Sequence, residues 1–265
     1  MHVHRSIIPV AVTAALLVAS CAHQPSPELL SARAQLQQLQ AQRSAINYTE
    51  GSYEYFVSHN GYPVTMNIFK NKELMAKANR HSKVVICLAQ QRGRLYVDNQ
   101  VAADWPVSTG ISGRETPPGH YSVLEKKPTY ASNRYGYLYN EKGRCINSNA
   151  DIFVDAIPEG GKFVGSSMPY WQRLTWDGVG MHIGKVIAGR RLSHGCIRTP
   201  REMAVDLYNI LGIGSKVSVL KDIEAEFPAR DAMAQAQNIK ELDRRIRDTK
   251  YRVDTLTMRE FPEGE

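Results

Sequence analysis

The chain has 265 residues, a formal net charge of +7 at pH 7 and 43% hydrophobic residues, so it is long enough for one substantial hydrophobic core with appendages. The positive charge favours anionic surroundings such as phosphate-bearing lipids, wall polymers or carboxylate-rich peptides. It does not favour nucleic acid, because the basic residues form no stripe with interleaved aromatic residues.

The N-terminus has the features of an export signal. Arg5 precedes an apolar run that is too short to span a membrane comfortably, which predicts a lipoprotein-type signal peptide over residues 1–20 and a tether over 21–27. The stretch ending at Cys21 resembles a bacterial lipobox, in which the cysteine is lipidated and anchors the mature chain to a membrane. Ala22 after this cysteine resembles outer-membrane sorting, so we expect an exported, lipid-anchored protein at the periplasmic face of the envelope. An ordinary cleaved signal peptide is the alternative.

Helical segments are predicted at both ends of the remaining chain. Residues 28–67 are expected to form an N-terminal helical extension and linker, and residues 222–265 a C-terminal helical extension. In each, apolar positions recur at alternating steps of three and four, as in a heptad seam. The seams are Leu29, Ala32, Leu36, Leu39, Arg43, Ile46 and Ile239, Leu242, Ile246, Thr249, Val253, Leu256. These helices either pack on each other, bind an envelope protein or a second copy, or lie on the central domain.

The central segment, residues 68–221, is predicted to be a β-rich α+β domain. Short β-branched and aromatic runs alternate there with turn residues. The runs are VVICLA (84–89), RLYV (94–97), QVAADWPVS (100–108), HYSVLEK (120–126), DIFVDAI (151–157), VGMHI (179–183) and KVSVL (216–220).

One helix of this domain is predicted directly after a cysteine. Thr199 and Glu202 form a capping box around Pro200, and Gly212 follows the apolar face at the other end. Cys196 is thereby expected just before a helix N-terminus, where free N–H groups and the helix dipole favour a thiolate.

Cys196 is the candidate nucleophile, because Gly195 before it permits a tight turn. Its base is expected to be His182, from a neighbouring strand, since His194 is only two residues away in the same turn. Two alternatives are weaker. His182, His194 and Cys196 could be three metal ligands, but no pair among them has the spacing typical of a zinc site. Ser193 could be the nucleophile, but no G-x-S-x-G elbow surrounds it. We therefore expect no metal and no organic cofactor.

Two further cysteines have no assigned chemistry. Cys87 lies in an apolar run and Cys145 in a loop-like stretch. An exported protein could join them as a disulfide, but their spacing does not establish that they are close enough.

The sequence around these residues resembles the L,D-transpeptidase catalytic domain of the YkuD type. That family has a histidine followed by Ser/Thr-His-Gly-Cys, an apolar residue, and Arg or Asn, here His182 and then SHGCIR over 193–198. VSTGISGRETPPGHY (107–121) resembles the Ser-Thr-Gly and Thr-Pro-x-Gly segments, and Met-Pro-Tyr over 168–170 resembles the Met-Pro-aromatic segment. The likeness covers roughly residues 68–220 in order, and the terminal helices lie outside it.

This resemblance implies a mixed β-sandwich with a helix after the catalytic cysteine, and an enzyme of peptidoglycan stem peptides. Cys196 would attack the carbonyl of the third stem residue, a diamino acid, release D-alanine and leave a thioester. An amine then resolves the thioester, giving a 3→3 crosslink or an attached protein. The resemblance also implies sensitivity to carbapenems. L,D-carboxypeptidase or crosslink hydrolase activity on the same fold is an alternative, and a non-catalytic envelope tether is another.

Further residues receive roles from the same resemblance. The backbone carbonyl of Ile183 would orient His182, and the amides around His194, Gly195 and Cys196 would stabilise the oxyanion. Substrate-binding roles are expected for Arg198, Ser193 and Tyr170. Each has a plainer alternative: Arg198 holding its loop, Ser193 bonding its own turn, and Tyr170 packing in the core.

Overall fold

The computed structural model describes residues 24–46, 48–59, 61–222 and 227–262. The predicted signal peptide and the lipidation site Cys21 lie outside the described residues. The chain divides into two compact units, one made of residues 43–244 and the other of the segments up to residue 42 and from residue 245. The larger unit therefore extends on both sides of the segment 68–221 expected from the sequence.

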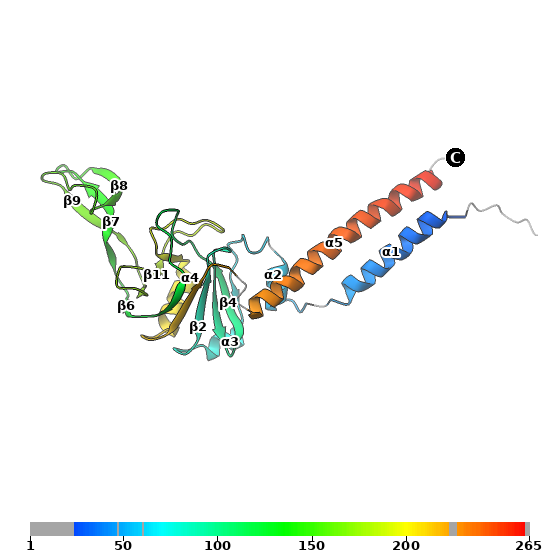
Figure 1. The fold of residues 1–265 in the computed structure, drawn as a ribbon, viewed down its shortest axis with the longest axis horizontal. Coiled ribbons are helices and arrows are strands. Elements are labelled where there is room, and N and C mark those ends of the chain that lie inside the picture. The colour runs from blue at the N-terminus through cyan, green and yellow to red at the C-terminus, as the bar shows by residue number, and fades with distance from the viewer. Residues whose placement is uncertain (1–23, 47, 60, 223–226, 263–265) are drawn as a thin grey trace, which may run out of the picture. The chain divides into compact units, whose positions relative to one another are not determined.

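A six-stranded sheet forms the centre of the larger unit (Figure 1). Its order is β1 (Phe69–Lys70), β4 (Gln100–Pro106), β3 (Arg92–Val97), β2 (Lys83–Cys87), β13 (Lys216–Leu220) and β5 (Gly119–Ser122). All neighbours are antiparallel except β13 and β2, which are parallel. β2, β3 and β4 are buried along almost their whole length, because both faces of the sheet are covered.

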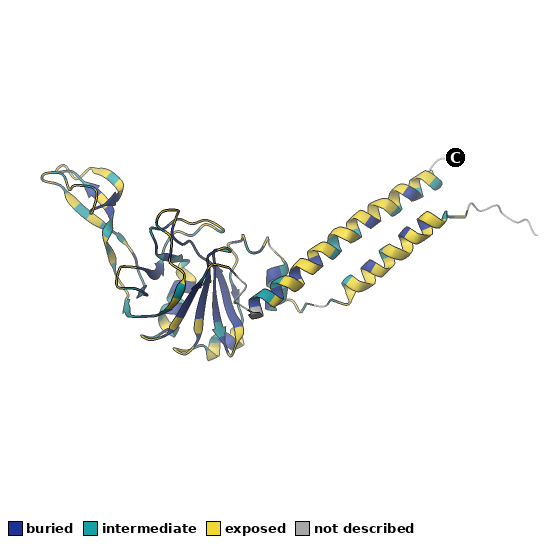
Figure 2. Ribbon diagram, viewed as in Figure 1, coloured by how far each residue is buried: buried dark blue, intermediate teal, exposed yellow. Residues whose placement is uncertain are grey.

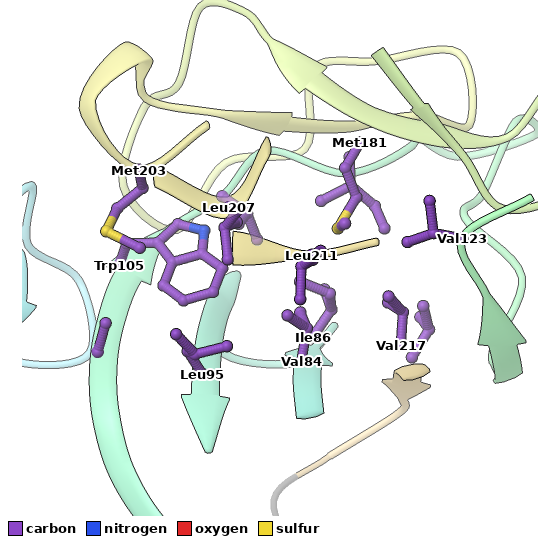
Figure 3. Close-up of a cluster of buried hydrophobic side chains, with 14 of the residues drawn as sticks. Val84, Ile86, Leu95, Trp105, Val123, Met181, Met203, Leu207, Leu211 and Val217 are labelled. Atoms are coloured by element: carbon purple, nitrogen blue, oxygen red, sulfur yellow. The ribbon is translucent and has the colours of Figure 1, made fainter. Parts of the chain in front are cut away.

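The main hydrophobic core lies on one face of this sheet, under helix α4 (Arg201–Ile210). Figure 3 shows Met203 and Leu207 of α4 beside Trp105 and Leu95 of the sheet. Space there is tight: a Cβ on Gly93 would come within 2.5 Å of the Trp105 ring. Fully burying a side chain such as Leu207 contributes about 1.5–3 kcal/mol.

The ends of α4 differ from the prediction. Pro200 is its N-cap and no side chain caps the helix, so the prediction of a capping box formed by Thr199 and Glu202 is wrong. Glu202 instead forms an ion pair with Lys70. The C-cap is Leu211 in an extended conformation, not a left-handed Gly212, and the last carbonyls accept hydrogen bonds from the amine of Lys126.

A four-stranded sheet covers another side of the same core. Its order is β12 (Ile197–Thr199), β11 (Gly180–Ile183), β10 (Trp171–Arg173) and β6 (Glu125–Lys127). β11 and β12 are parallel, and the other pairs are antiparallel. Because β12 separates Cys196 from α4, the prediction that this cysteine directly precedes a helix N-terminus is wrong.

A three-stranded sheet, of order β8 (Cys145–Asp151), β7 (Ala131–Tyr139) and β9 (Lys162–Ser167), was not predicted. The run 151–157 is not a strand as expected: only Asp151 belongs to β8, and Phe153 and Val154 lie in the following turn, 74% and 79% exposed. Cys145 is exposed on β8 and is a free cysteine, so no disulfide joins it to Cys87, which is buried in β2.

The other face of the six-stranded sheet is covered by the segment that precedes β1, including helix α2 (Tyr53–Ser58), while α3 (Lys72–Lys77) lies between β1 and β2 in the chain. Helix α5 (Phe227–Glu260) contributes Ala229, Ala232 and Ala236 to the same apolar cluster. Beneath it, Asp104 forms ion pairs with Arg92 and Arg94, all three fully buried.

The smaller unit contains α1 (Pro27–Ser44), up to residue 42, and the C-terminal part of α5. Leu29 and Ala32 pack against Leu256, and Arg252 pairs with Glu28 at 2.9 Å. All positions of the two predicted seams are buried or partly buried, and all except Ile46, which follows the end of α1, lie within α1 or α5; Figure 2 shows these stripes in blue and teal. Within the described residues, no helix has the length and apolar content needed to cross a membrane.

Candidate active site

The predicted catalytic residues lie on one face of the four-stranded sheet. Met181 and Ile197 pair across β11 and β12, and both point into the core, where they are 1% and 0% exposed. Successive residues of a strand point to opposite faces. The next pair, His182 and Arg198, therefore lies on the face away from that core.

Cys196 directly precedes β12 in a turn held by hydrogen bonds. Gly195 has a φ of +116°, a region that favours glycine. The hydroxyl of Ser193 donates to the Cys196 carbonyl at 2.5 Å and accepts from the Gly195 N–H at 3.1 Å. Thr116 holds the turn from outside, since its hydroxyl donates to the Gly195 carbonyl at 2.7 Å.

The segment that contains Thr116 is the Ser-Thr-Gly stretch singled out in the sequence. Backbone bridges join Ser108 to Arg198 and Gly110 to Ser193. A Cβ on Gly110 would lie 2.0 Å from the carbonyl oxygen of Arg114, so only glycine fits there. The backbone of this stretch therefore holds the cysteine turn in place through hydrogen bonds.

His182 is buried, with its Nδ1 2.8 Å from the backbone carbonyl oxygen of Ile183. This is the contact that the resemblance implied. Because a carbonyl only accepts, Nδ1 carries the proton and Nε2 is left as the acceptor. Burial lowers the pKa of His182 to about 4, opposed by the Ile183 carbonyl and assisted by the positive charge of Arg198. The imidazole is neutral at pH 7 and able to accept a proton.

The thiol of Cys196 is partly exposed, and its Sγ lies 3.4 Å from the carbonyl oxygen of Gly178, to which it donates. Burial of its surroundings raises the pKa of the Cys196 thiol. The backbone N–H of Gly180 and the charges of Arg198 and Arg173 act in the opposite direction but do not outweigh it. The resting thiol is therefore protonated at neutral pH.

The resting site consequently holds a neutral thiol and a neutral imidazole, not a preformed ion pair. Cys196 lies two residues before the partner of His182 in the parallel register. From the usual strand spacing and rise, the two Cα atoms are diagonal neighbours about 8 Å apart. A thiol and an imidazole on the same face can span that distance.

The predicted oxyanion donors are only partly available. The N–H of Gly195 is donated to the Ser193 hydroxyl, so this prediction fails for the resting turn. The structure describes no acceptor for the backbone N–H of Cys196 among residues 24–46, 48–59, 61–222 and 227–262. The Cys196 amide is thus a better candidate donor than the Gly195 amide.

His194 lies in the turn before β12, outside the four-stranded sheet that carries His182. Its ring makes an edge contact with Tyr135 of β7, 4.5 Å between centroids. Burial lowers the pKa of His194, with the charges of Arg114 and Arg198 acting in the same direction. The side chain therefore packs against the three-stranded sheet, which favours His182 as the base.

Arg198 is half-buried, and within the part of the chain that the structure describes its guanidinium has no ion-pair partner. Its stem passes over Gly184, where a Cβ would lie 2.7 Å from Arg198 Cγ. Its backbone N–H and carbonyl bond Ser108 at 3.0 and 3.1 Å. The backbone, not the guanidinium, holds the loop, so the charge remains available for an anion.

The other two predicted substrate contacts are placed differently. Ser193 is 2% exposed and its hydroxyl is used within the turn, which matches the plainer of its two roles. Tyr170 has a φ of +55° and packs edge-on against Tyr208 of α4, 5.2 Å between ring centroids. Neither geometry directs the side chain at the sulfur.

Sequence reasoning missed the turn between β10 and β11. The carbonyl oxygen of Gly178 in this turn accepts a hydrogen bond from the Cys196 thiol. The ring of Trp176, which is 75% exposed, has its centroid 5.4 Å from the guanidinium carbon of Arg173. Nothing in the sequence marked Gly178 or Arg173 as neighbours of the cysteine.

The metal-site alternative is not supported. Among the described residues no three His, Cys, Asp or Glu side chains are grouped so that they could hold a metal ion. The ring of His194 contacts Tyr135, whereas Nδ1 of His182 is bonded to the carbonyl of Ile183.

The chain is similar to several known proteins. Among curated proteins, a 4-hydroxy-tetrahydrodipicolinate synthase from Methanocaldococcus jannaschii is 24% identical over 203 residues, 74% of this chain and 64% of that protein. The chain thus spans less than two thirds of that relative, and at this identity nothing of its activity is carried over.

Two solved structures are similar in fold. An L,D-transpeptidase from Mycobacterium smegmatis has 21% identity and a TM-score of 0.40, over 52% of this chain and 58% of that chain. An L,D-transpeptidase from Stackebrandtia nassauensis has 20% identity and a TM-score of 0.39, over 71% and 67%.

A family model described as the L,D-transpeptidase catalytic domain, YkuD, matches residues 81–219, more than half of the chain. The matched segment contains both His182 and Cys196. The chain therefore belongs to the L,D-transpeptidase catalytic domain family.

Proposed function

We propose that this protein is a peptidoglycan L,D-transpeptidase in which Cys196 is the nucleophile and His182 the general base. The carrying observation is that a thiol and a buried imidazole with a free Nε2 lie on one face of one small sheet. The family supports the substrate class, the stem peptides of the cell wall.

The first step forms a thioester. The sulfur of Cys196 attacks the carbonyl carbon of the third stem residue, a diamino acid, while the thiol proton passes to Nε2 of His182. The negative charge on the carbonyl oxygen is stabilised by backbone N–H groups of the cysteine turn. The carbon–nitrogen bond then breaks, and the imidazolium returns the proton to the amine of the departing D-alanine.

The second step transfers the acyl group. An amine attacks the thioester carbon, the carbon–sulfur bond breaks, and His182 accepts the proton of the attacking amine and returns it to the sulfur. A neighbouring stem as acceptor gives a 3→3 crosslink, and a protein lysine gives an attached protein. Water in place of the amine would make the protein an L,D-carboxypeptidase or crosslink hydrolase.

Both groups of the resting site are neutral, and the two pKa shifts oppose transfer of the thiol proton in the absence of substrate. With a pKa of about 4, His182 is deprotonated at neutral pH, so its Nε2 can accept the thiol proton once substrate is bound. A substrate carbonyl above the sulfur would draw the thiol away from Gly178, with which it is hydrogen-bonded at rest. Arg198, charged and without an ion-pair partner among the described residues, is placed to bind a substrate carboxylate.

The surroundings of this activity are part of the proposal. A lipid on Cys21 would hold the enzyme at the periplasmic face of the envelope, on the outer membrane. The paired helices of the smaller unit would bind an envelope protein or a second copy. Neither is needed for the chemistry at Cys196.

The test is incubation of the protein with tetrapeptide muropeptides and mass analysis of the products. Crosslinked dimers indicate transpeptidation, and shortened tripeptides indicate hydrolysis. Cys196→Ala should abolish either product, and a carbapenem should form an adduct at Cys196 in the unaltered protein. If no product forms and Cys196→Ala fully complements a deletion strain, while loss of the lipid site does not, the protein is a non-catalytic tether.

A further inference from the structure

A tryptophan lies beside the proposed base in the four-stranded sheet. Arg173 of β10 pairs with Gly180 of β11. Because the two strands are antiparallel, two steps along this register place Trp171 opposite His182. Their rings are neighbours, with 6.0 Å between the centroids. One row of side chains thus crosses the sheet on the face of His182, and it consists of Lys127, Trp171, His182 and Arg198.

The same indole extends along β11 toward the strand neighbour of the nucleophile. Gly180 has no side chain, and a Cβ there would lie 2.5 Å from Cη2 of Trp171. Gly180 is also the residue whose backbone N–H acts on the thiol of Cys196. One ring therefore packs against His182 and against the backbone beside Cys196.

Trp171 is fully buried although it lies on the face away from the main core. Tyr130, between β6 and β7, stacks on its ring with 4.9 Å between centroids and 28° between planes. The guanidinium carbon of Arg173 lies 5.5 Å from the Trp171 centroid. Within the described residues the indole N–H has no acceptor, so packing alone holds the ring. A side chain without exposed surface does not touch a substrate, so any effect on the reaction passes through its neighbours.

His182 needs such a neighbour. In the part of the chain that the structure describes, its imidazole has one hydrogen bond, between Nδ1 and the carbonyl oxygen of Ile183 at 2.8 Å. One hydrogen bond fixes one atom of the ring and leaves the ring free to turn about that bond. Misplacing a reacting group by about 1 Å can cost about a hundredfold in rate. The flat indole, itself confined by Tyr130 and Gly180, supplies the second constraint.

The indole also separates the base from water on the β10 side. The charged and titratable groups in this row and the next one are Glu125, Lys127, Arg173, Cys196 and Arg198. Arg198 lowers the pKa of His182, but burial is the larger cause. Because Trp171 covers the β10 side of the imidazole, part of this burial is due to Trp171.

We propose that Trp171 is a positioning residue for the reaction: its indole keeps the imidazole of His182 on the Ile183 carbonyl and shields it from water. The inference rests on the proposed function and deepens it, because it names the side chain that holds the base in one orientation beside Cys196. Trp171 itself transfers no proton and touches no substrate.

The experiment replaces Trp171 in the full-length protein by Leu, which removes the flat ring, and by Phe, which keeps one. Trp171→Leu should lower kcat on tetrapeptide muropeptides about tenfold or more and change KM less than about twofold, because the indole has no exposed surface. The acidic limb of the pH–rate profile should move to higher pH, because a less buried imidazole has a higher pKa. Trp171→Phe should retain most of the turnover.

Trp105 provides a matched control. It is also fully buried, its indole N–H also lacks an acceptor among the described residues, and a Cβ on Gly93 would come within 2.5 Å of its ring. Its ring lies in the main core and not beside His182. Trp105→Leu and Trp105→Phe should lower Tm at least as much as the changes at Trp171, without moving the pH–rate profile. Equal movement of that profile in both pairs of variants, or turnover of Trp171→Leu equal to that of the unaltered protein, would overturn the inference.

Titration of the imidazole distinguishes this failure from failure of the proposed function. The NMR signal of the His182 ring, identified by its loss in His182→Gln, is followed across acid and neutral pH. Its pKa should rise by about one unit or more in Trp171→Leu and stay unchanged in the Trp105 variants. This result supports the inference even if no variant forms product, an outcome that refutes the proposed function alone. A His182 titration that is the same in Trp171→Leu and the unaltered protein refutes the inference whatever the turnover.

Discussion

Asp104 is the residue whose replacement should most sharply test how the flanking segments are attached to the catalytic unit. Its carboxylate is fully buried and accepts bonds from Arg92 at 2.7 Å and Arg94 at 2.9 Å. The hydroxyls of Tyr53 and Tyr62, from the segment before β1, donate to it at 2.7 and 2.8 Å. One buried negative charge thus faces two buried positive charges.

Asp104→Asn keeps the shape of the side chain and removes its charge. Both guanidinium groups then remain buried without a counter-charge, for which the expected loss is about 3–5 kcal/mol of unfolding free energy. A typical domain is stable by only about 5–15 kcal/mol, so the loss should be a large fraction of the total. Urea denaturation, followed by the shift of the midpoint at constant slope, measures it.

Asp206→Asn is the matched control. Asp206 pairs with Lys70 at 2.8 Å, but its side chain is 35% exposed, so the same chemical change should be worth less than about 1 kcal/mol. If Asp104→Asn destabilises the protein no more than Asp206→Asn does, the argument that the buried charge of Asp104 holds the segment before β1 on the six-stranded sheet is refuted.

The dependence of stability on pH gives an independent check that the charged carboxylate of Asp104 stabilises the folded state. Burial raises the pKa of Asp104, but Arg92, Arg94 and the two tyrosine hydroxyls lower it more, so the pKa in the folded state lies below its ordinary value. Stability from this group is therefore fully present above the unfolded pKa of about 3.9 and is lost as pH falls through the folded value. The stability difference between the unaltered protein and Asp104→Asn should shrink as pH falls below about 4.

Three further predictions concern the site. Because burial raises the pKa of Cys196, its alkylation by iodoacetamide should be slow at pH 7 and accelerate only above pH 9; a plateau already reached at pH 7 would contradict a neutral resting thiol. Ser193→Ala removes two bonds of the cysteine turn and should lower kcat/KM at least tenfold with a small change in Tm, whereas unchanged turnover would exclude this role. Gly110→Ala places a Cβ 2.0 Å from a carbonyl oxygen and should lower both turnover and Tm; a normal Tm would show that the loop has room.

Local pattern was enough to predict much of the catalytic unit from the sequence. Buried strands such as β2 and β13 are short β-branched runs between turn residues, and their burial follows from that composition. Cys196 was predicted because Gly195 before it permits a tight turn, and His182 because it lies in a strand-like segment that can bring it beside the cysteine. The terminal helices were visible because their buried stripes follow the helical period.

The three-stranded sheet was missed because its strands lack such a pattern. β7 contains Gly136 and has several exposed or half-buried positions on either side, so neither face shows a clear alternation. The apolar run 151–157 suggested a strand instead, although Phe153 and Val154 are exposed in a turn. Composition predicts burial only where an element covers the side chains. Phe153 has the guanidinium of Arg134 over its ring, 4.7 Å from the centroid, but remains largely exposed.

The sequence by itself predicted Cys196 as the nucleophile, His182 as its base and the strand that carries His182, because these depend on neighbours in the chain and on side-chain period. Only the tertiary structure decided the surroundings of Asp104 and Ser193. Each depends on a partner brought close by strand register or by the cysteine turn: two arginines around Asp104, and the amide of Gly195 against Ser193. Register and turn hydrogen bonds are properties of the folded backbone, so no spacing along the chain encodes them.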